Sequence, residues 1–268
     1  MRADVAAAIA VAETFGVVST DPLLLHETNN TVVWLRPAAV VAKVATRPNA
    51  RNDIRSEHAV ALELVAVGGE IAPPLAGAFP LVHEETGFVV TLWDWLDGLD
   101  RTEVEPRALR ESLRRLHAAL AETSLELPSF PAALMRARAA LDDGAMMAAM
   151  PTDDRAFLRD VYDEGLQTLA DTVPHEHRLH GEPHDGNRLI TSAGLRWIDF
   201  ESCCKGPLEW DLAFLPREDD AQLGAIDHDL LARLRRLNRA RIATWCLAES
   251  RFPNMRLYGE GHLALLRS

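Results

Sequence analysis

The sequence has little cysteine, little lysine and no long hydrophobic run. Its 268 residues include three cysteines, Cys203, Cys204 and Cys246. Two of them are adjacent and their number is odd, so a disulfide framework is not expected and a reducing, cytoplasmic location is favoured. No transmembrane segment is predicted. The Ala-rich N-terminus lacks the pattern of a signal peptide, so residues 3–15 are predicted to form a helix of the mature protein.

Basic residues are scarce relative to acidic ones. The net charge of −12 argues against a nucleic acid as the main partner, because neutralising phosphates requires a basic surface. Such a charge favours a cationic small molecule, although acidity also serves solubility. Lysine occurs only at Lys43 and Lys205 in an otherwise arginine-rich sequence. These two positions are therefore candidates for a specific role.

The periodicity of the chain changes near residues 93–98. Before this seam, β-branched runs separated by polar turns predict strands, and the turn "HETNNT" predicts a hairpin. After it, leucines at helical spacing predict a mainly helical remainder. The predicted strands lie within 22–47 and 80–98, and the predicted helices at 52–67, 106–121, 153–172 and 221–248. Residues 178–200 are predicted to form a loop, a strand, a turn and a second strand.

Lys43 lies in the apolar run "AAVVAKVAT". Burying an ammonium group is unfavourable unless a partner neutralises it. The following helix carries Glu57, which could be that partner. A strand lysine paired with a helix glutamate positions ATP phosphates in kinases. The alternative is a lysine on an edge strand that points to water.

The stretch "HGEPHDGN", followed by "GLRWIDFE", contains the groups that phosphoryl transfer needs. That reaction requires a carboxylate to orient or deprotonate the attacking hydroxyl, and oxygen ligands for Mg²⁺. Glu182 could supply the first, and Asn187 and Asp199 the second. In "KGPLEWDLAFL", Asp211 falls at the start of an apolar helix. A carboxylate in that place is expected to accept backbone hydrogen bonds.

Taken in order, these segments resemble the aminoglycoside phosphotransferase family, which has a protein-kinase-like fold. The matching residues are Lys43, Glu57, "LWDWLDG", "LRRLHAAL", "HGEPHDGN", "WIDFE" and "GPLEWDLA". The resemblance implies an α+β fold with an N-terminal nucleotide-binding lobe over 1–95 and a C-terminal catalytic and substrate-binding lobe over 96–268. It also implies an enzyme that uses ATP or GTP and Mg²⁺ to phosphorylate a hydroxyl of a small molecule.

The resemblance assigns roles to individual residues. The nucleotide would be held by Lys43, Glu57, Asn29, Asn30, Trp93, Asp94 and Leu96. Within this set, the two asparagines would lie over the nucleotide, and the backbone at Asp94 and Leu96 would hydrogen-bond the base. Asn187 and Asp199 would bind Mg²⁺. His180 and Asp211 would brace the catalytic loop.

Glu182 departs from the family pattern, which usually reads His-Gly-Asp. The reference pKa of Glu is close to that of Asp, so Glu182 could still act as the catalytic base. However, positional errors near 1 Å can cost about a hundredfold in rate. One interpretation is a pocket adapted to Glu182, and the other is a non-catalytic nucleotide-binding pseudokinase. Asp185 is a minor alternative as the base.

Histidines and further carboxylates allow other interpretations. Four histidines, His175, His177, His180 and His184, could ligate zinc as in metallo-β-lactamase-like hydrolases. That family, however, expects an aspartate where Leu179 stands. Candidates for contact with a cationic acceptor are Glu201, Glu218, Asp219, Asp220 and Asp227. For the acidic run 217–229, the alternative is a solvated turn.

Overall fold

A computed structural model describes residues 1–27, 30–47, 50–98, 104–170, 177–216 and 226–268. The chain packs into two compact units, one of residues 1–126 with 182–203 and the other of residues 127–181 with 204–268. The N-terminal part contains an antiparallel sheet and the C-terminal part is mainly helical, which confirms the predicted α+β class. A lobe boundary at 95/96 stays a prediction.

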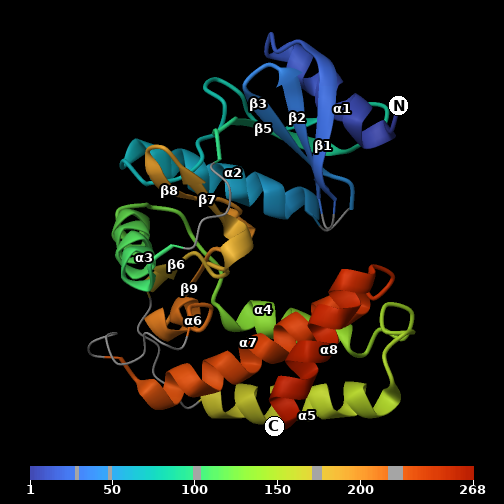
Figure 1. The fold of residues 1–268 in the computed structure, drawn as a ribbon, viewed down its shortest axis with the longest axis vertical. Coiled ribbons are helices and arrows are strands. Elements are labelled where there is room, and N and C mark those ends of the chain that lie inside the picture. Colours follow the sequence, from blue (N-terminus) through green and yellow to red (C-terminus); the bar gives the residue numbers. More distant parts are fainter. Residues whose placement is uncertain (28–29, 48–49, 99–103, 171–176, 217–225) are drawn as a thin grey trace. The chain divides into compact units, whose positions relative to one another are not determined.

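The first unit contains the five-stranded sheet, with strand order β1-β2-β3-β5-β4 and antiparallel neighbours (Figure 1). Its elements are α1 (Ala3–Thr14), β1 (Ser19–Glu27), β2 (Thr31–Pro37), β3 (Val40–Ala45), α2 (Ala50–Ala66), β4 (Leu81–Val82), β5 (Val89–Asp94), α3 (Pro106–Ala121), β7 (Arg188–Thr191) and β8 (Gly194–Trp197). The predicted hairpin, the helix near 52–67 and the helix at 106–121 are therefore confirmed.

The two faces of this sheet carry different side chains because strand residues alternate between faces. Val33, Leu35 and Ala42 are buried in a core that includes the apolar side of α1. Ala45 packs instead with the α2 residue Ile54. Since Lys43 and Ala45 are two residues apart on β3, both face α2. Because of this alternation, the Lys43 side chain lies on the face of the sheet that packs against the helix carrying Glu57.

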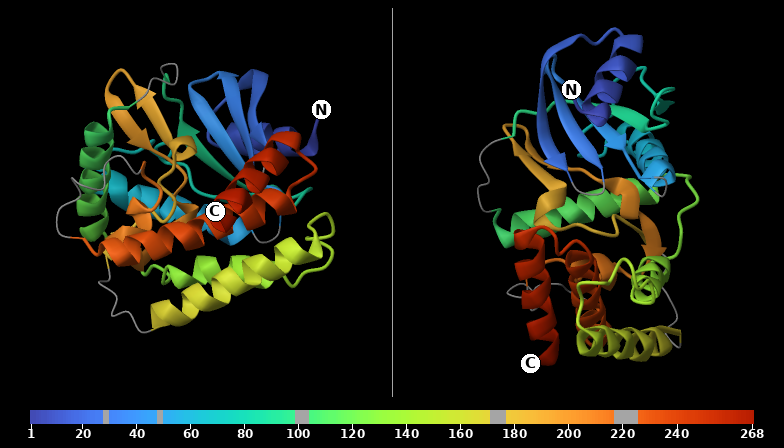
Figure 2. Two further views of the ribbon diagram at one scale, coloured as in Figure 1. Left: turned by 60° about the horizontal axis from the view of Figure 1, so that its bottom comes forward. Right: turned by 90° about the vertical axis from the view of Figure 1, so that its right-hand side faces the viewer.

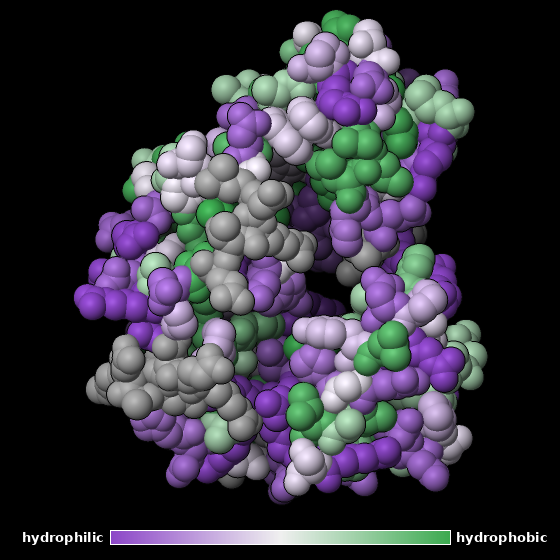
Figure 3. Space-filling view, viewed as in Figure 1, coloured by the Kyte–Doolittle hydropathy of each residue, from purple (hydrophilic) through white to green (hydrophobic). Residues whose placement is uncertain are grey.

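The edge strand β1 presents apolar side chains to solvent. Leu23, Leu24 and Leu25 are exposed, and Figure 3 shows an apolar patch over this strand. The buried core of the unit lies further in, between α1 and the central strands.

Helix α1 is tied to the sheet by Asp4, which is almost fully buried. The Arg2 Nη2 atom lies 2.7 Å from Asp4 Oδ2, and the Thr31 hydroxyl donates to the same oxygen at 2.7 Å. The amide of Val5 donates to Asp4 Oδ1. The hydrogen bond from Arg2 outweighs the effect of burial and, with Thr31 and Val5, lowers the pKa of Asp4 from 3.8 to about 2.

This lowered pKa predicts an acid-sensitive contribution to stability. Because the folded protein binds this proton more weakly than the unfolded chain, the contribution is complete above pH 4 and is lost as the pH falls towards 2. We expect Asp4→Asn to reduce the free energy of unfolding by about 2 kcal/mol at pH 6. Denaturant unfolding of both proteins between pH 2 and 6 measures the difference. A difference that does not shrink at low pH would contradict this assignment.

The second unit is built from helices and one two-stranded sheet. Its elements are α4 (Pro131–Ala140), α5 (Thr152–Ala170), β6 (His177–Leu179), β9 (Cys204–Gly206), α6 (Leu208–Leu212), α7 (His228–Ala248) and α8 (Pro253–Arg267). Helices α4, α5, α7 and α8 share one core, in which Leu134, Tyr162 and Leu234 are fully buried. Figure 2 shows α8 beside α7, and these two helices contact each other extensively.

Helix α5 confirms the prediction at 153–172, whereas α4 and α8 were not predicted. Helix α7 begins at His228, and residues 221–225 of its predicted range lie outside the described residues. The thiols of the three cysteines are buried and form no disulfide, as expected. Within the described ranges, no helix is both long and apolar enough to cross a membrane.

Candidate active site

Lys43 is surrounded by three carboxylates of the first unit. Its Nζ atom lies 2.7 Å from Glu57 Oε2, 2.9 Å from Asp199 Oδ1 and 2.8 Å from Glu201 Oε1. Glu57 comes from α2, whereas the other two carboxylates follow β8. The predicted pairing of Lys43 with Glu57 is therefore present, and the edge-strand alternative does not apply. The sequence did not predict that Glu201 would join this cluster.

Charge and burial make this cluster unusual. Burial alone would lower the pKa of Lys43, but the charges of Asp199, Glu57 and Glu201 outweigh it and raise that pKa well above the ordinary value. Burial and the neighbouring carboxylates raise the pKa of Glu57 despite the nearby lysine. With all three carboxylates ionised, these four side chains carry a formal surplus of two negative charges, and burial together with this surplus raises the pKa of Glu201 as well as that of Glu57. Such a surplus favours an additional cation.

Asp199 occupies a left-handed backbone conformation with φ 66°, which is uncommon for a residue other than glycine. It directly precedes a short 3₁₀ turn, Phe200–Ser202. The amide of Phe200 donates to Glu57 Oε1 at 3.3 Å. This hydrogen bond links the 3₁₀ turn to helix α2. The backbone conformation of Asp199 is of the uncommon kind that concentrates at functional sites.

The carboxylates around Lys43 could hold a metal ion. Glu57, Asp199 and Glu201 each offer an oxygen, and these atoms lie within 4.8 Å of one another. Oxygen donors of this type suit a hard cation such as Mg²⁺. Across the described part of the chain, this is the one group of three or more potential ligands with such spacing, and it contains no histidine. The zinc interpretation of the histidine cluster therefore finds no support, and its His175 lies outside the described residues.

Glu182 and Asn187 lie together in the loop before β7. The Asn187 side-chain amide donates to the Glu182 carbonyl at 2.9 Å. The Ser202 hydroxyl donates to Glu182 Oε2 at 3.0 Å. Asn187 also joins the strand that leads to Asp199, because its carbonyl accepts the amide of Ile198 at 3.0 Å. Sequence reasoning missed Ser202, which holds one oxygen of the candidate base.

Asp211 is fully buried in the second unit. It accepts the amide of His180 at 2.9 Å and that of Gly181 at 2.8 Å. The indole of Trp210 donates to the Gly181 carbonyl at 3.1 Å. Gly181 has φ 84°, a conformation that glycine adopts without strain. Since Gly181 directly precedes Glu182, these are the contacts that the predicted bracing role requires. The role itself stays a prediction.

We expect Asp211→Asn to lower the free energy of unfolding by about 2–3 kcal/mol, because an amide cannot accept both buried N–H groups as well as a carboxylate does. Asp143→Asn is the matched control: its carboxylate also accepts two backbone amides, but on the surface. Chemical denaturation at neutral pH compares the two variants. If both substitutions lower the free energy of unfolding equally, the burial of Asp211 does not strengthen its hydrogen bonds.

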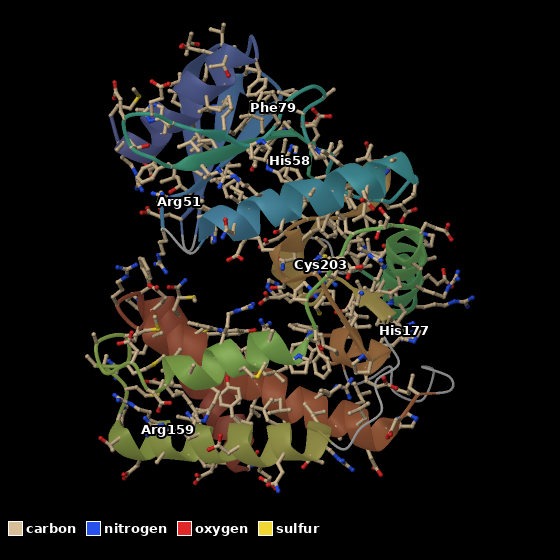
Figure 4. The ribbon with its side chains drawn as sticks, turned by 180° about the vertical axis from the view of Figure 1, so that it is seen from behind. Arg51, His58, Phe79, Arg159, His177 and Cys203 are labelled. Carbon is tan, nitrogen blue, oxygen red and sulfur yellow. The ribbon has the colours of Figure 1, made fainter. Side chains whose placement is uncertain are left out.

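The end of β5 carries Trp93, whose predicted place beside the nucleotide stays a prediction. Trp93 is buried, donates to the Thr91 hydroxyl at 2.9 Å and meets the ring of His58 edge-on. Figure 4 labels His58 on α2. The partly exposed aromatic surface is instead a stack of Trp34 and Trp95, whose ring centroids are 3.8 Å apart.

The backbone at this end of β5 is partly engaged. The amide of Asp94 donates to the Pro73 carbonyl, and that of Trp95 donates to the Ala39 carbonyl. Leu96, the other residue predicted to hydrogen-bond the base, is half-buried. Contacts of Asp94 and Leu96 with a base stay predictions.

Several predicted residues have other surroundings or cannot be described. Asp227 caps α7 by accepting the amides of Asp229 and Leu230. The Asp185 carboxylate is exposed and pairs with Arg188 at 2.7 Å. Four candidates lie outside the described residues: Asn29, Glu218, Asp219 and Asp220.

Comparison with known proteins decides the family. The model of the APH family, described as the phosphotransferase enzyme family, matches residues 23–245. The chain belongs to this family. No curated protein gives a significant match to this phosphotransferase-family chain.

Solved structures show that the fold of this phosphotransferase-family protein is kinase-like. The choline kinase LicA from Streptococcus pneumoniae has a TM-score of 0.67 at 15% identity, with 94% of this chain and 96% of LicA covered. The amicoumacin kinase hAmiN, solved with AMP-PNP, Ca²⁺ and Ami, has a TM-score of 0.69 at 15% identity, with 98% of this chain and 96% of hAmiN covered. APH(2")-IIia, solved with GDP and kanamycin, has a TM-score of 0.69 at 14% identity, with 97% of each chain covered.

Proposed function

We propose that this protein is a Mg²⁺-dependent O-phosphotransferase that moves the γ-phosphoryl group of ATP or GTP to a hydroxyl of a small molecule. The observation that carries the proposal is the cluster of Lys43, Glu57, Asp199 and Glu201, because a buried lysine with surplus negative charge around it fits a phosphate and its cation together. Family membership supports the same reaction class.

Each side chain would have a defined task in this reaction. Lys43, oriented by Glu57, would contact phosphate oxygens of the nucleotide. Asn187 and Asp199 would hold Mg²⁺, which when bound supplies neutralisation of the developing phosphate charge. Glu201 is close enough to Lys43 to share in orienting it.

Glu182 would orient the acceptor hydroxyl and accept its proton. The Glu182 carboxylate accepts a hydrogen bond from the Ser202 hydroxyl, which holds one of its two oxygens. This contact supports the proposal that Glu182 can serve as the base despite its extra methylene. Because phosphoryl transfer depends mainly on positioning and charge, such a fixed carboxylate supports activity rather than a pseudokinase.

The acceptor is proposed only as a class. Relatives of this fold include kinases for choline, an amino alcohol, and a protein solved with kanamycin, an aminoglycoside. Both compounds are cationic hydroxyl compounds, and the chain carries a net charge of −12, which attracts cations. We therefore propose a cationic hydroxyl compound as the acceptor, with an antibiotic as one candidate.

A nucleotide-product screen tests the proposal. The purified protein is incubated with Mg²⁺, with ATP or GTP in turn, and with a panel of amino alcohols, aminoglycosides and neutral sugars. Release of ADP or GDP that depends on one acceptor supports the function, and mass spectrometry should find that acceptor heavier by one phosphoryl group. Nucleotide binding without transfer to any acceptor would favour the pseudokinase. If the protein neither binds a nucleotide nor transfers a phosphoryl group, the proposal is wrong.

A further inference from the structure

The N-terminus contacts the last residue pair of the β1–β2 hairpin. Arg2 binds Glu27 through two hydrogen bonds, Nη1 to Oε2 and Nη2 to Oε1, each 2.7 Å long. Arg2 also binds Asp4, which accepts the hydroxyl of Thr31. Glu27 and Thr31 face each other across the two strands. Arg2 and Asp4 therefore connect both strands at the same level.

The residue before Thr31 reaches the Lys43 cluster. The Asn30 side-chain amide donates to Glu201 Oε1 at 2.6 Å. The same oxygen lies 2.8 Å from Lys43 Nζ. Asn30 directly precedes Thr31, so a single peptide unit joins the contact of Thr31 with Asp4 to that of Asn30 with Glu201. A continuous series of contacts thus runs from Arg2 to Lys43.

Most of this series is shielded from water. Asp4, Thr31 and Asn30 are 6%, 2% and 7% exposed. The Arg2–Glu27 pair is exposed, whereas the hydrogen bond between Asp4 and Thr31 is buried and restricts geometry more than an exposed contact does. Within the described residues, Asn30 Oδ1 is buried without a hydrogen-bond partner. The Asn30 amide group is therefore oriented through its donor side, by Glu201, and by the backbone that Thr31 fixes.

We propose that Arg2 and Asp4 are positioning residues for nucleotide binding, which act by fixing Thr31 and thereby Asn30 against Glu201 and Lys43. The inference rests on the proposed function, because the cluster that they position is the one assigned to the phosphates. Both residues precede the range that the family model matches, which begins at residue 23. This chain thus supports its phosphate-binding lysine from a segment outside that range.

The test measures Mg²⁺-nucleotide affinity by calorimetry with AMP-PNP, using the full-length chain. We expect Arg2→Gln and Asp4→Asn to weaken binding about tenfold, and Asn30→Ala about thirtyfold. Residues that act through one path are not additive, so Asp4→Asn combined with Asn30→Ala should weaken binding by about thirtyfold rather than three-hundredfold. In turnover assays, KM for the nucleotide rises while KM for the acceptor and kcat change little.

Two controls separate positioning from a general loss of structure. Arg107→Gln removes an exposed ion pair on α3 and should leave affinity unchanged. Ala8→Gly weakens α1 at a fully buried position without removing a contact of the Arg2–Asp4–Thr31 series, and so reports the effect of destabilising the helix alone. If Ala8→Gly weakens nucleotide binding as much as Asp4→Asn does, or if the two effects in the double variant multiply, the inference is wrong. If the wild-type protein binds no nucleotide, the proposed function fails and this inference fails with it.

Discussion

Replacing Asp199 with asparagine is expected to lower turnover by about a thousandfold or more while the chain still folds. Asparagine has the same shape, and it tolerates the left-handed backbone conformation that Asp199 adopts. The substitution removes one negative charge at 2.9 Å from Lys43 Nζ and one proposed Mg²⁺ ligand. Both losses act where phosphate charge would develop, so the effect should fall on turnover rather than on stability.

This result can be checked before the acceptor is known. If the protein hydrolyses ATP or GTP without an acceptor, that basal rate serves as the first measurement, and a thermal shift on addition of Mg²⁺ serves as a second one that does not depend on turnover. Asp229→Asn is the control, because Asp229 is an exposed carboxylate at the start of α7. If Asp199→Asn keeps both the basal rate and the Mg²⁺-dependent shift, the metal role of Asp199 must be abandoned.

Replacing Glu182 with glutamine is expected to reduce kcat by roughly a hundredfold to ten-thousandfold, the range over which a general base contributes. Glutamine preserves length and can still accept the hydrogen bond from Ser202, but it cannot take a proton. Nucleotide affinity should stay the same, because Glu182 has no proposed contact with the nucleotide. Steady-state kinetics with the acceptor identified in the screen separates these two quantities.

Glu182→Asp tests the extra methylene directly. Aspartate keeps the charge but is too short to reach the same place, so the contact with Ser202 at 3.0 Å is lost. We expect a smaller loss of kcat than in Glu182→Gln, and Ser202→Ala should cause a loss of similar size to Glu182→Asp. If Glu182→Gln retains full turnover, Glu182 is not the base, and Asp185→Asn becomes the next variant to assay.

Local sequence patterns predicted much of the fold, because the spacing and type of apolar residues depend on whether a segment is a helix or a strand. The apolar, β-branched run "AAVVAKVAT" placed Lys43 on a strand, and leucine spacing placed the helices α3 and α5. Helices α4 and α8 were missed. The apolar positions of α4 are small and scattered, and α8 is apolar on one side but exposes Leu257, Tyr258 and Leu265. In α4 the pattern is too weak to show which side packs, and in α8 apolar residues occur on the exposed side as well as on the buried side.

Individual site residues were predictable to different degrees. Lys43, Glu57, Asn187 and Asp199 were candidates from their types and order. Their order cannot show that Glu201 would bind Lys43, because the partner lies 158 positions away in the chain. The same holds for Trp34 and Trp95, which stack only because β2 and β5 flank β3 in the sheet.

The sequence by itself indicated the family and the α+β class, and it supplied the candidates for the phosphate-binding lysine, the base and the metal ligands, since each follows from residue type and order. Only the tertiary structure decided which carboxylates share one lysine, which hydroxyl fixes Glu182, and how Arg2 and Asp4 reach Asn30. The physical reason is that a hydrogen bond or ion pair depends on distances of about 3 Å between atoms. Such distances between residues far apart in the chain exist only once the strands, helices and turns have packed.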